Sequence, residues 1–557
     1  MIKPNVTPWT WRPSQSLSLC IGAMSSSAST SRKFSTMNDD RQIYEYTSGR
    51  WIYNEHTRLA ERRTEINVDA LKSTVARSLQ RSDTGIKCLS KLAEGGFNRV
   101  LQITMLDGIK VLSRLPYPST QPKGFAVASE VATLALLRAH GLPVPRVYAY
   151  STDATNPVGS EYIIMEELPG QPLGDRWFGL SDRERLKVLL QLVQLEAKIY
   201  AIQLPASGSI YYASDLPSDS PRVAVPDSDF CIGPDAALKW WFAERASLRV
   251  DCGPCADPID VLRNPALKEL AWLRKYGRPR FPFERAYRES MGYRLSDPSE
   301  HIESLESYLK IAPRLLPSNE FLRPVLRHPD LQPNNIFVSD DLEIVGLIDW
   351  QHAAVLPLFL AAGIPKFVQN YDDPESLHFR PPPTPDLEDL DEEEKADALH
   401  DFRRRHTHFF YLAFTQRFNE PHFRAMDQTT NMLTRLVFSH AGDPWEGNNI
   451  PLLADLVLLA KSWHEYSTDP CPISFSTAKS DSIMHLQSMQ EEIDIQLKHI
   501  RNAISISIDG WTPSEEYEAA CARARQMKVD GLASLDTDYE REMTDRHWPF
   551  DDHNEDE

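Results

Sequence analysis

Two short stretches near the middle of the chain decide the fold: residues 326–335 read Leu-Arg-His-Pro-Asp-Leu-Gln-Pro-Asn-Asn, and residues 348–350 read Ile-Asp-Trp. In the first, Asp330 and Asn335 share a short loop that contains two prolines. In the second, Asp349 follows an apolar run with the pattern of a strand. Carboxylate and amide oxygens are the hard ligands that Mg²⁺ prefers. The two stretches therefore predict a site that combines a loop carboxylate with oxygen ligands for a metal ion.

The spacing of these residues matches a pattern that kinases use for phosphoryl transfer. That pattern is H-R-D-x-x-x-x-N, followed by an aspartate at a strand turn. Asp330 would orient the acceptor hydroxyl, while Asn335 and Asp349 would hold the metal. Asp330 alone would be an ordinary loop carboxylate, but the ordered combination favours a catalytic core.

Composition limits the class of protein. At 557 residues the chain is too long for one ordinary core, so we expect two lobes with extensions. A hydrophobic content of 41% excludes a disordered protein, and a net charge of −19 argues against a general nucleic-acid binder. The 7 cysteines do not form a disulfide pattern. We interpret Cys252 and Cys255 as ordinary loop cysteines rather than a redox or zinc pair. No apolar run is long enough to span a membrane.

The first 38 residues differ in composition from the rest. They contain lysine, arginine and many serines, and the first acidic residue is Asp39. This composition is typical of a mitochondrial transit peptide, and residues 32–35 (Arg-Lys-Phe-Ser) resemble a matrix-protease cleavage site. A disordered serine-rich tail is the alternative. We expect a mitochondrial protein.

Hydrophobic periodicity predicts the two lobes. Five strands are expected at residues 87–92, 100–105, 111–115, 147–150 and 161–165, together with a helix that Ser129 caps. Helical patterns follow at residues 182–204, 402–460 and 483–527, whereas the acidic run at 386–397 indicates an exposed loop.

These patterns predict an α+β, protein-kinase-like bilobal fold. The N-lobe would be a small five-stranded sheet with one helix, and the C-lobe would be large and mainly helical. We divide the chain into a targeting or disordered segment (1–38), an N-lobe with an N-terminal extension (39–168), a C-lobe with the catalytic loop and metal motif (169–470), and a helical C-terminal extension with an acidic tail (471–557).

The N-lobe also offers a candidate cover for nucleotide phosphates. Gly95 and Gly96 lie between two predicted strands and permit close backbone approach, with Phe97 and Asn98 beside them. Two glycines between strands often mean only a turn, and the full G-x-G-x-x-G is absent. Their place upstream of the catalytic loop favours the phosphate cover.

An arginine occupies the position where the third strand of kinases carries lysine. Arg114 ends the segment Val-Leu-Ser-Arg, and Glu130 on the following helix could pair with it. Arginine is planar and bidentate, so it is no simple substitute for lysine. Arg114 could contact nucleotide phosphates, or it could form a structural ion pair without nucleotide.

Residues 161–168 read Glu-Tyr-Ile-Ile-Met-Glu-Glu-Leu and resemble a strand with the hinge that holds adenine. Backbone groups around Glu167 and Leu168 would then contact the base. A buried strand that ends in an acidic turn is an equal alternative.

With these motifs, the chain resembles the aminoglycoside phosphotransferase family, whose catalytic loop reads H-G-D-x-H-P-x-N before an I-D-W-type metal motif. Pro329 replaces the glycine and Gln332 replaces the second histidine. This variant loop, the Gly-Gly-Phe-Asn segment and P-V-G-x-E-Y-I-I-M-E are similar to a fungal mitochondrial group, the altered inheritance of mitochondria protein 9 group. The resemblance implies ATP and Mg²⁺ as cofactors, Asp330 as catalytic base, and Asn335 and Asp349 as metal ligands.

Two functional hypotheses follow. The first is an ATP-dependent phosphotransferase that acts on a hydroxyl of a small molecule in mitochondria. The second is a catalytically weak or inactive kinase-like protein that binds nucleotide and supports mitochondrial inheritance. The arginine at position 114, where kinases carry lysine, is the reason to retain this second hypothesis. A protein kinase is disfavoured because no A-P-E motif follows Asp349.

Overall fold

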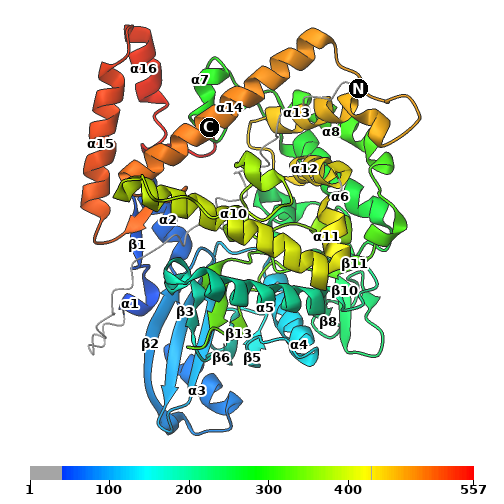
Figure 1. Cartoon of the computed structure of the whole chain (residues 1–557). Coiled ribbons are helices and arrows are strands. Elements are labelled where there is room, and N and C mark those ends of the chain that lie inside the picture. The colour runs from blue at the N-terminus through cyan, green and yellow to red at the C-terminus, as the bar shows by residue number, and fades with distance from the viewer. Residues whose placement is uncertain (1–40, 428) are drawn as a thin grey trace.

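The computed structural model describes residues 41–427 and 429–557, coloured along the chain in Figure 1. The predicted targeting segment, residues 1–38, lies outside the described residues.

The N-lobe is built on an antiparallel five-stranded sheet, as expected. Its strand order is β2-β3-β4-β6-β5. The strands are β2 (Ile86–Glu94), β3 (Asn98–Met105), β4 (Lys110–Pro116), β5 (Val147–Ser151) and β6 (Tyr162–Glu166). All four pairings are antiparallel.

A helix covers each face of this sheet because apolar residues alternate along its strands. Leu101 and Ile103 of β3 join one buried cluster with Leu71 of α3 (Val68–Ser78), a helix of the N-terminal extension. On the other face, Val127 and Val131 of α4 (Phe125–Ala139) pack with β6. The kinase-like N-lobe is thus confirmed, with an additional helix from the extension.

The start of α4 differs from the prediction. The helix begins at Phe125 after Gly124, so Ser129 lies inside it and is buried rather than capping it. The backbone N–H of Gly124 donates to the carboxylate of Glu161 (3.0 Å). The apolar residues that follow Gly124 extend the start of α4 by one more buried turn.

The first long helix of the C-lobe is α5 (Asp182–Tyr200), whose first turn carries a capping box formed by Ser181 and Glu184. Its short strands are β7 (Gln171–Pro172), β8 (Ser209–Tyr212), β9 (Val223–Ala224), β10 (Phe230–Gly233), β11 (Pro324–Leu326), β12 (Ile336–Val338), β13 (Ile344–Leu347) and β14 (Val355–Pro357). They form the sheets β8-β10-β9, β13-β12-β7 and β11-β14.

The remaining C-lobe helices, apart from the short segment Tyr287–Ser290, pack around one large apolar core. They are α6 (Pro258–Tyr276), α7 (Tyr287–Ser290), α8 (Pro298–Ile311), α9 (Leu358–Ala361), α10 (Glu392–Phe418), α11 (Glu420–Asp427), α12 (Thr429–Gly442) and α13 (Ile450–Lys461).

The acidic run predicted as a loop is partly helical. Its second half forms the first turns of α10, where Asp391 and Glu394 make a capping box. Carboxylates are favourable at this end because they offset the positive end of the helix dipole. The prediction at residues 386–397 was therefore wrong from Glu392 onward.

The C-terminal extension contains α14 (Thr477–Ile504), β15 (Trp511–Pro513), α15 (Tyr517–Ala533) and α16 (Asp538–Arg546). The helix predicted at 483–527 is thus broken, at a turn where Ser505 and Gly510 have positive φ. In this break β15 pairs with β1 (Gly49–Trp51) of the N-terminal extension, which also carries α1 (Arg41–Tyr44) and α2 (Glu55–Arg62). Figure 1 shows α15 and α16 as a hairpin beside α14.

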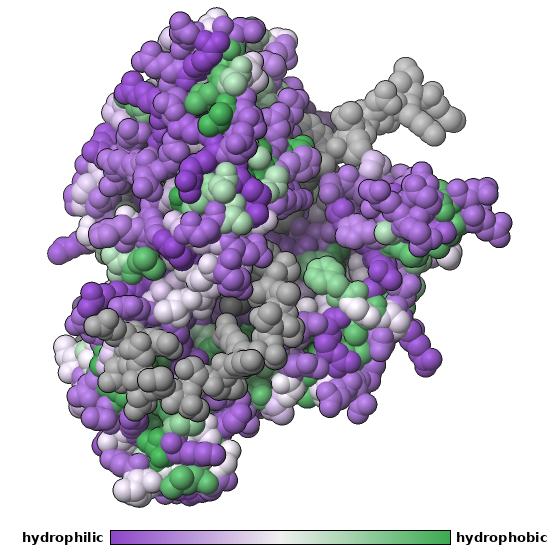
Figure 2. Space-filling model, turned by 90° about the vertical axis from the view of Figure 1, so that its left-hand side faces the viewer, coloured by the Kyte–Doolittle hydropathy of each residue, from purple (hydrophilic) through white to green (hydrophobic). Residues whose placement is uncertain are grey.

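The surface is largely polar on the face shown in Figure 2, where apolar residues form separate patches. In the part of the chain that the structure describes, no helix has both the length and the apolar character needed to cross a membrane.

Candidate active site

Hydrogen bonds tie the catalytic loop to the strand turn that carries Asp349. His328 Nε2 donates to the backbone carbonyl of Ile348 (2.8 Å), and the backbone N–H of Ile348 donates to the carbonyl of Asn335 (3.0 Å). The His328 ring also packs against Trp350, with ring centroids 4.5 Å apart. The residues that the sequence places in two separate motifs therefore form one constellation.

Asp330 lies at the centre of the loop. Its backbone N–H donates to His328 Nδ1 (3.1 Å), and its Oδ2 accepts from Gln332 Nε2 (2.8 Å). Burial and the nearby charge of Asp349 raise the pKa of Asp330 to about 6. The side chain is ionised at neutral pH but remains basic enough to accept a proton.

Asn335 is buried and faces Asp330. Its Nδ2 donates to the backbone carbonyl of Asp330 (2.8 Å). Since the amide nitrogen is engaged in this way, Oδ1 is the atom able to bind a metal. Asn335 and Asp349 together could supply two protein ligands, which would suit Mg²⁺ because this ion often takes its other ligands from phosphates and water. No larger group of potential metal ligands occurs among the described residues.

The backbone around Asp349 is unusual. Asp349 has φ 64° and His352 has φ 63°, so two non-glycine residues of one turn adopt the left-handed conformation. This conformation costs energy for residues with a Cβ and is concentrated at functional sites. The Asp349 side chain is 45% exposed and therefore accessible to a ligand.

Arg114 and Glu130 pair as the sequence indicated, and Arg114 reaches further than expected. Its guanidinium forms an ion pair with Glu130 on α4 and a second one with Asp349 (2.7 Å). Arg114 also donates to Gln351 Oε1 (2.7 Å). One buried cation thus links the N-lobe sheet and α4 to the candidate metal ligand.

The loop with Gly95 and Gly96 forms the turn between β2 and β3. A Cβ at Gly95 would meet only the backbone oxygen of Asn98, at 3.7 Å, so packing does not by itself require glycine at this position. The ring of Phe97 contacts His352, with centroids 5.3 Å apart, and the amide of Asn98 lies 2.6 Å from Gln351 Oε1. The loop therefore lies next to the turn of Asp349.

Glu167 and Leu168 follow β6, at the junction of the two lobes. Glu167 accepts from Gln102 Nε2 (2.8 Å), and the Leu168 side chain packs close to Gly346 of β13. This junction is where a hinge would lie, but the two residues do not join the polar constellation around Arg114.

Three residues near the site were not predicted. Gln351 bridges Arg114 and Asn98, and His352 Nδ1 donates to the backbone carbonyl of Ala236 (2.8 Å). The positive charge of Lys366 acts to lower the pKa of Asp330, against the larger effect of burial. The first two directly follow Ile-Asp-Trp, so extending that motif by two positions would have found them. Lys366 does not belong to any of the sequence motifs.

Comparison with known families gives one matching model. Residues 92–359 match the phosphotransferase enzyme family, designated APH. The match covers β3, α4, the catalytic loop and the turn of Asp349, and it ends before α10.

Among curated proteins, a subtelomeric hrmA-associated cluster protein of Aspergillus fumigatus is 32% identical over 83% of this chain and 96% of its own length. Altered inheritance of mitochondria protein 9, mitochondrial, of Saccharomyces cerevisiae is 23% identical over 78% of this chain and 74% of its own length.

Among solved structures, a putative aminoglycoside phosphotransferase of Ralstonia eutropha has 14% identity and a TM-score of 0.30, covering 77% of this chain and 97% of that chain. An ethanolamine kinase of Plasmodium vivax has 12% identity and a TM-score of 0.32, covering 72% of this chain and 82% of that chain.

Proposed function

The chain belongs to the phosphotransferase enzyme family, and from this premise we propose that it transfers the terminal phosphoryl group of ATP to a hydroxyl of a small molecule. The observation that carries the proposal is the set of hydrogen bonds that joins the loop of Asp330 and Asn335 to the turn of Asp349. Phosphoryl transfer depends mainly on positioning and electrostatics, and these three side chains supply both.

Each residue has a defined role in the proposed reaction. As the acceptor oxygen bonds to the γ-phosphorus, the bond from that phosphorus to the β,γ-bridging oxygen breaks and ADP leaves. Asp330 takes the proton of the hydroxyl, and Gln332 holds the Asp330 carboxylate in place. Asn335 and Asp349 would hold Mg²⁺, which neutralises charge on the phosphate oxygens when bound.

The N-lobe residues would bind the nucleotide. The backbone at Gly95 and Gly96, with Phe97 and Asn98, would cover the phosphates. Arg114, positioned by Glu130, would contact the α- and β-phosphates, and the backbone at Glu167 and Leu168 would contact the adenine.

The test is single-turnover transfer from ATP over a panel of hydroxylated metabolites. Asp330→Asn keeps the size of the side chain but removes the base, so we expect transfer to fall about 10²- to 10⁴-fold with nucleotide binding retained. Asp341→Asn, in the exposed turn between β12 and β13, is the matched control and should leave transfer unchanged. Full activity of Asp330→Asn would contradict the assigned role.

A second candidate is a kinase-like protein that binds nucleotide without transferring phosphate. The ion pair between Arg114 and Asp349 favours it, because the pair occupies a carboxylate that the metal needs. Thermal stabilisation by Mg²⁺·ATP, with no transfer to any acceptor and no ADP release, would support this candidate over the first.

We also propose that the protein acts in mitochondria. Support comes from the basic, serine-rich composition of residues 1–38 and from the mitochondrial designation of the yeast relatives. A fluorescent fusion of the full chain should co-localise with a mitochondrial marker, and deletion of residues 1–38 should abolish this. An unchanged distribution after deletion would contradict the targeting role.

A further inference from the structure

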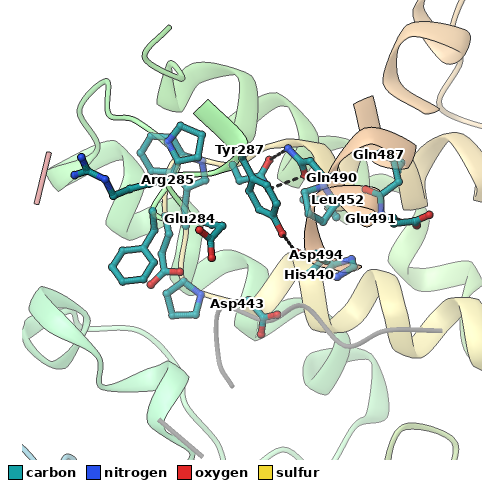
Figure 3. A pocket seen from close by; sticks show the side chains of 18 of the residues that line it. Glu284, Arg285, Tyr287, His440, Asp443, Leu452, Gln487, Gln490, Glu491 and Asp494 are labelled. Carbon is teal, nitrogen blue, oxygen red and sulfur yellow. Dashed lines mark hydrogen bonds between the residues drawn. The ribbon is translucent and has the colours of Figure 1, made fainter. Parts of the chain in front are cut away.

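A cavity of about 230 Å³ lies among the C-lobe helices and the two chain extensions. None of the candidate active-site residues lines it. Figure 3 shows its wall: Tyr287 reaches toward α14 and donates to Asp494 (2.6 Å), with Gln487 and Gln490 beside it. The size limits an occupant to a small molecule.

One histidine in this wall lacks partners for its polar atoms. The His301 side chain on α8 is only 4% exposed, and neither ring nitrogen has a hydrogen-bond partner. Its ring stacks on Trp445, with centroids 6.4 Å apart. Burial lowers the pKa of His301 to about 4, so the ring is neutral and offers one acceptor and one donor. Leaving such a group unsatisfied costs about 1–3 kcal/mol, which a ligand can relieve.

The charge of the wall is negative. Eight carboxylate residues and three arginines line the cavity. Some carboxylates are compensated within the protein, since Glu284 pairs with Arg501 (2.9 Å) and Asp455 pairs with His440 (2.6 Å). Negative charge remains in excess after these pairs are set aside. Such a wall favours a cation and disfavours phosphates and carboxylic acids.

Glu446 is the carboxyl most suited to a ligand. Among the described residues, no hydrogen bond or ion pair is formed by its side chain, although it lines the cavity next to Trp445. Burial outweighs the nearby positive charges of Arg280 and Arg245 and, with the negative charges of Asp443 and Glu269, raises the pKa of Glu446 to about 8, so this carboxyl holds a proton at neutral pH. A bound cation would stabilise the ionised form.

The cavity also has an apolar side. Trp445, Leu452 and Met484 line it together with the polar groups. An occupant that satisfies both sides carries a positive charge at one end and hydrocarbon at the other. An aromatic face such as that of Trp445 also attracts cations.

We propose that this cavity binds a small organic amine. Its ammonium group would contact Glu446, His301 and the surrounding carboxylates, and its hydrocarbon part would pack against Trp445 and Leu452. The site depends on both extensions of the chain, since Tyr53 and Asp509 also line it. Most of its wall lies outside residues 92–359, the part that matches the family. The inference concerns binding and does not rest on the proposed transfer reaction.

The test is calorimetric titration of the full chain with hexylamine and with 1-hexanol, which has nearly the same shape but no charge. Hexylamine should bind at least ten-fold more tightly than 1-hexanol. Its binding enthalpy at pH 7 should depend on the ionisation enthalpy of the buffer, because Glu446 releases a proton.

Glu446→Gln should weaken hexylamine binding at least ten-fold and abolish the buffer dependence, while leaving 1-hexanol binding unchanged. Glu465→Gln, an exposed carboxyl outside the cavity, is the matched control and should change neither. Circular dichroism of each variant establishes that it is folded. Equal affinities for the amine and the alcohol, no binding of hexylamine, or full binding by folded Glu446→Gln would each overturn the proposal.

Discussion

Arg114 contacts two acidic residues that have different roles in the proposed reaction. Glu130 would hold Arg114 in place, whereas Asp349 would bind the metal. Burial acts to raise the pKa of Asp349, but Arg114 beside it lowers this pKa below its ordinary value. In this arrangement the proposed Mg²⁺ would have to compete with the guanidinium for the Asp349 carboxylate.

Replacement of Arg114 by lysine tests this competition. An ammonium group cannot span Glu130 and Asp349 as the planar guanidinium does, so Asp349 should be released. We expect Arg114→Lys to lower the Mg²⁺ concentration for half-maximal binding of a non-hydrolysable ATP analogue several-fold. Arg138→Lys, at a half-exposed site on α4, the helix that carries Glu130, is the control. An unchanged or higher Mg²⁺ requirement in Arg114→Lys would contradict the competition.

The residues of the candidate site were predictable to different degrees. Asp330, Asn335 and Asp349 could be identified because a short loop and a strand turn impose fixed spacing on them. Gln351 directly follows the second motif, but its contact with Arg114 could not be predicted, since Arg114 lies more than two hundred positions earlier and reaches it across the lobe interface. Sequence spacing reports contacts within a motif, whereas the partners of Arg114 depend on the packing of the lobes.

Among the elements, the N-terminal extension is attached directly to the end of β2. The Oε2 atom of Glu94 accepts from the backbone N–H groups of Thr47 (2.8 Å) and Ser48 (3.0 Å). Glu94 is buried and immediately precedes Gly95. The pairing of β1 with β15 continues this connection into the C-terminal extension. The extension therefore fixes one side of the glycine loop.

Glu94→Gln should loosen this attachment. The neutral amide accepts hydrogen bonds more weakly than the carboxylate and also loses its ion pair with Arg99 (3.2 Å). We expect faster amide hydrogen exchange at residues 47–51 and 95–98, with little change in β6. Glu65→Gln, an exposed residue of the same extension, serves as the control. Exchange rates in Glu94→Gln equal to those of the unaltered protein would rule out this anchoring role.

Element prediction succeeded where local pattern and packing agree. Each of the five N-lobe strands overlaps its predicted range. The start of α10 was missed because its acidic residues look like a loop by composition, whereas their position after Asp391 makes them a favourable first turn. The pairing of β1 with β15 joins opposite ends of the chain, and no local signal indicates it.

At the scale of the whole molecule, a buried charged cluster holds the C-lobe helices together. Glu269 on α6 accepts from Arg245 Nε (2.8 Å) and from the backbone N–H of Trp445 (2.7 Å), and Lys268 Nζ lies 3.4 Å from it. The Lys268 and Glu269 side chains have no exposed surface. The Glu269 carboxylate thus compensates two buried cations. It also holds Trp445, which lines the cavity proposed to bind an amine.

Glu269→Gln should therefore destabilise the protein far more than loss of a surface ion pair. Two buried cations would lose their counter-charge, which costs about 3–5 kcal/mol of unfolding free energy. Urea denaturation at pH 7 measures the loss. Glu306→Gln, which removes the exposed pair with Arg274, should cost less than about 1 kcal/mol.

The pH dependence gives the same prediction a second readout. Burial acts to raise the pKa of Glu269, but Arg245 and Lys268 outweigh it and lower this pKa from 4.5 to about 2. A carboxyl with a depressed pKa stabilises the folded state fully above its unfolded pKa, and this contribution is lost as the pH falls through the folded pKa. The difference in unfolding free energy between the unaltered protein and Glu269→Gln should therefore shrink as the pH falls from about 4.5 to 2. A difference that stays constant down to pH 2, or a loss no larger than that of Glu306→Gln, would show that the Glu269 charge does not hold the cluster together.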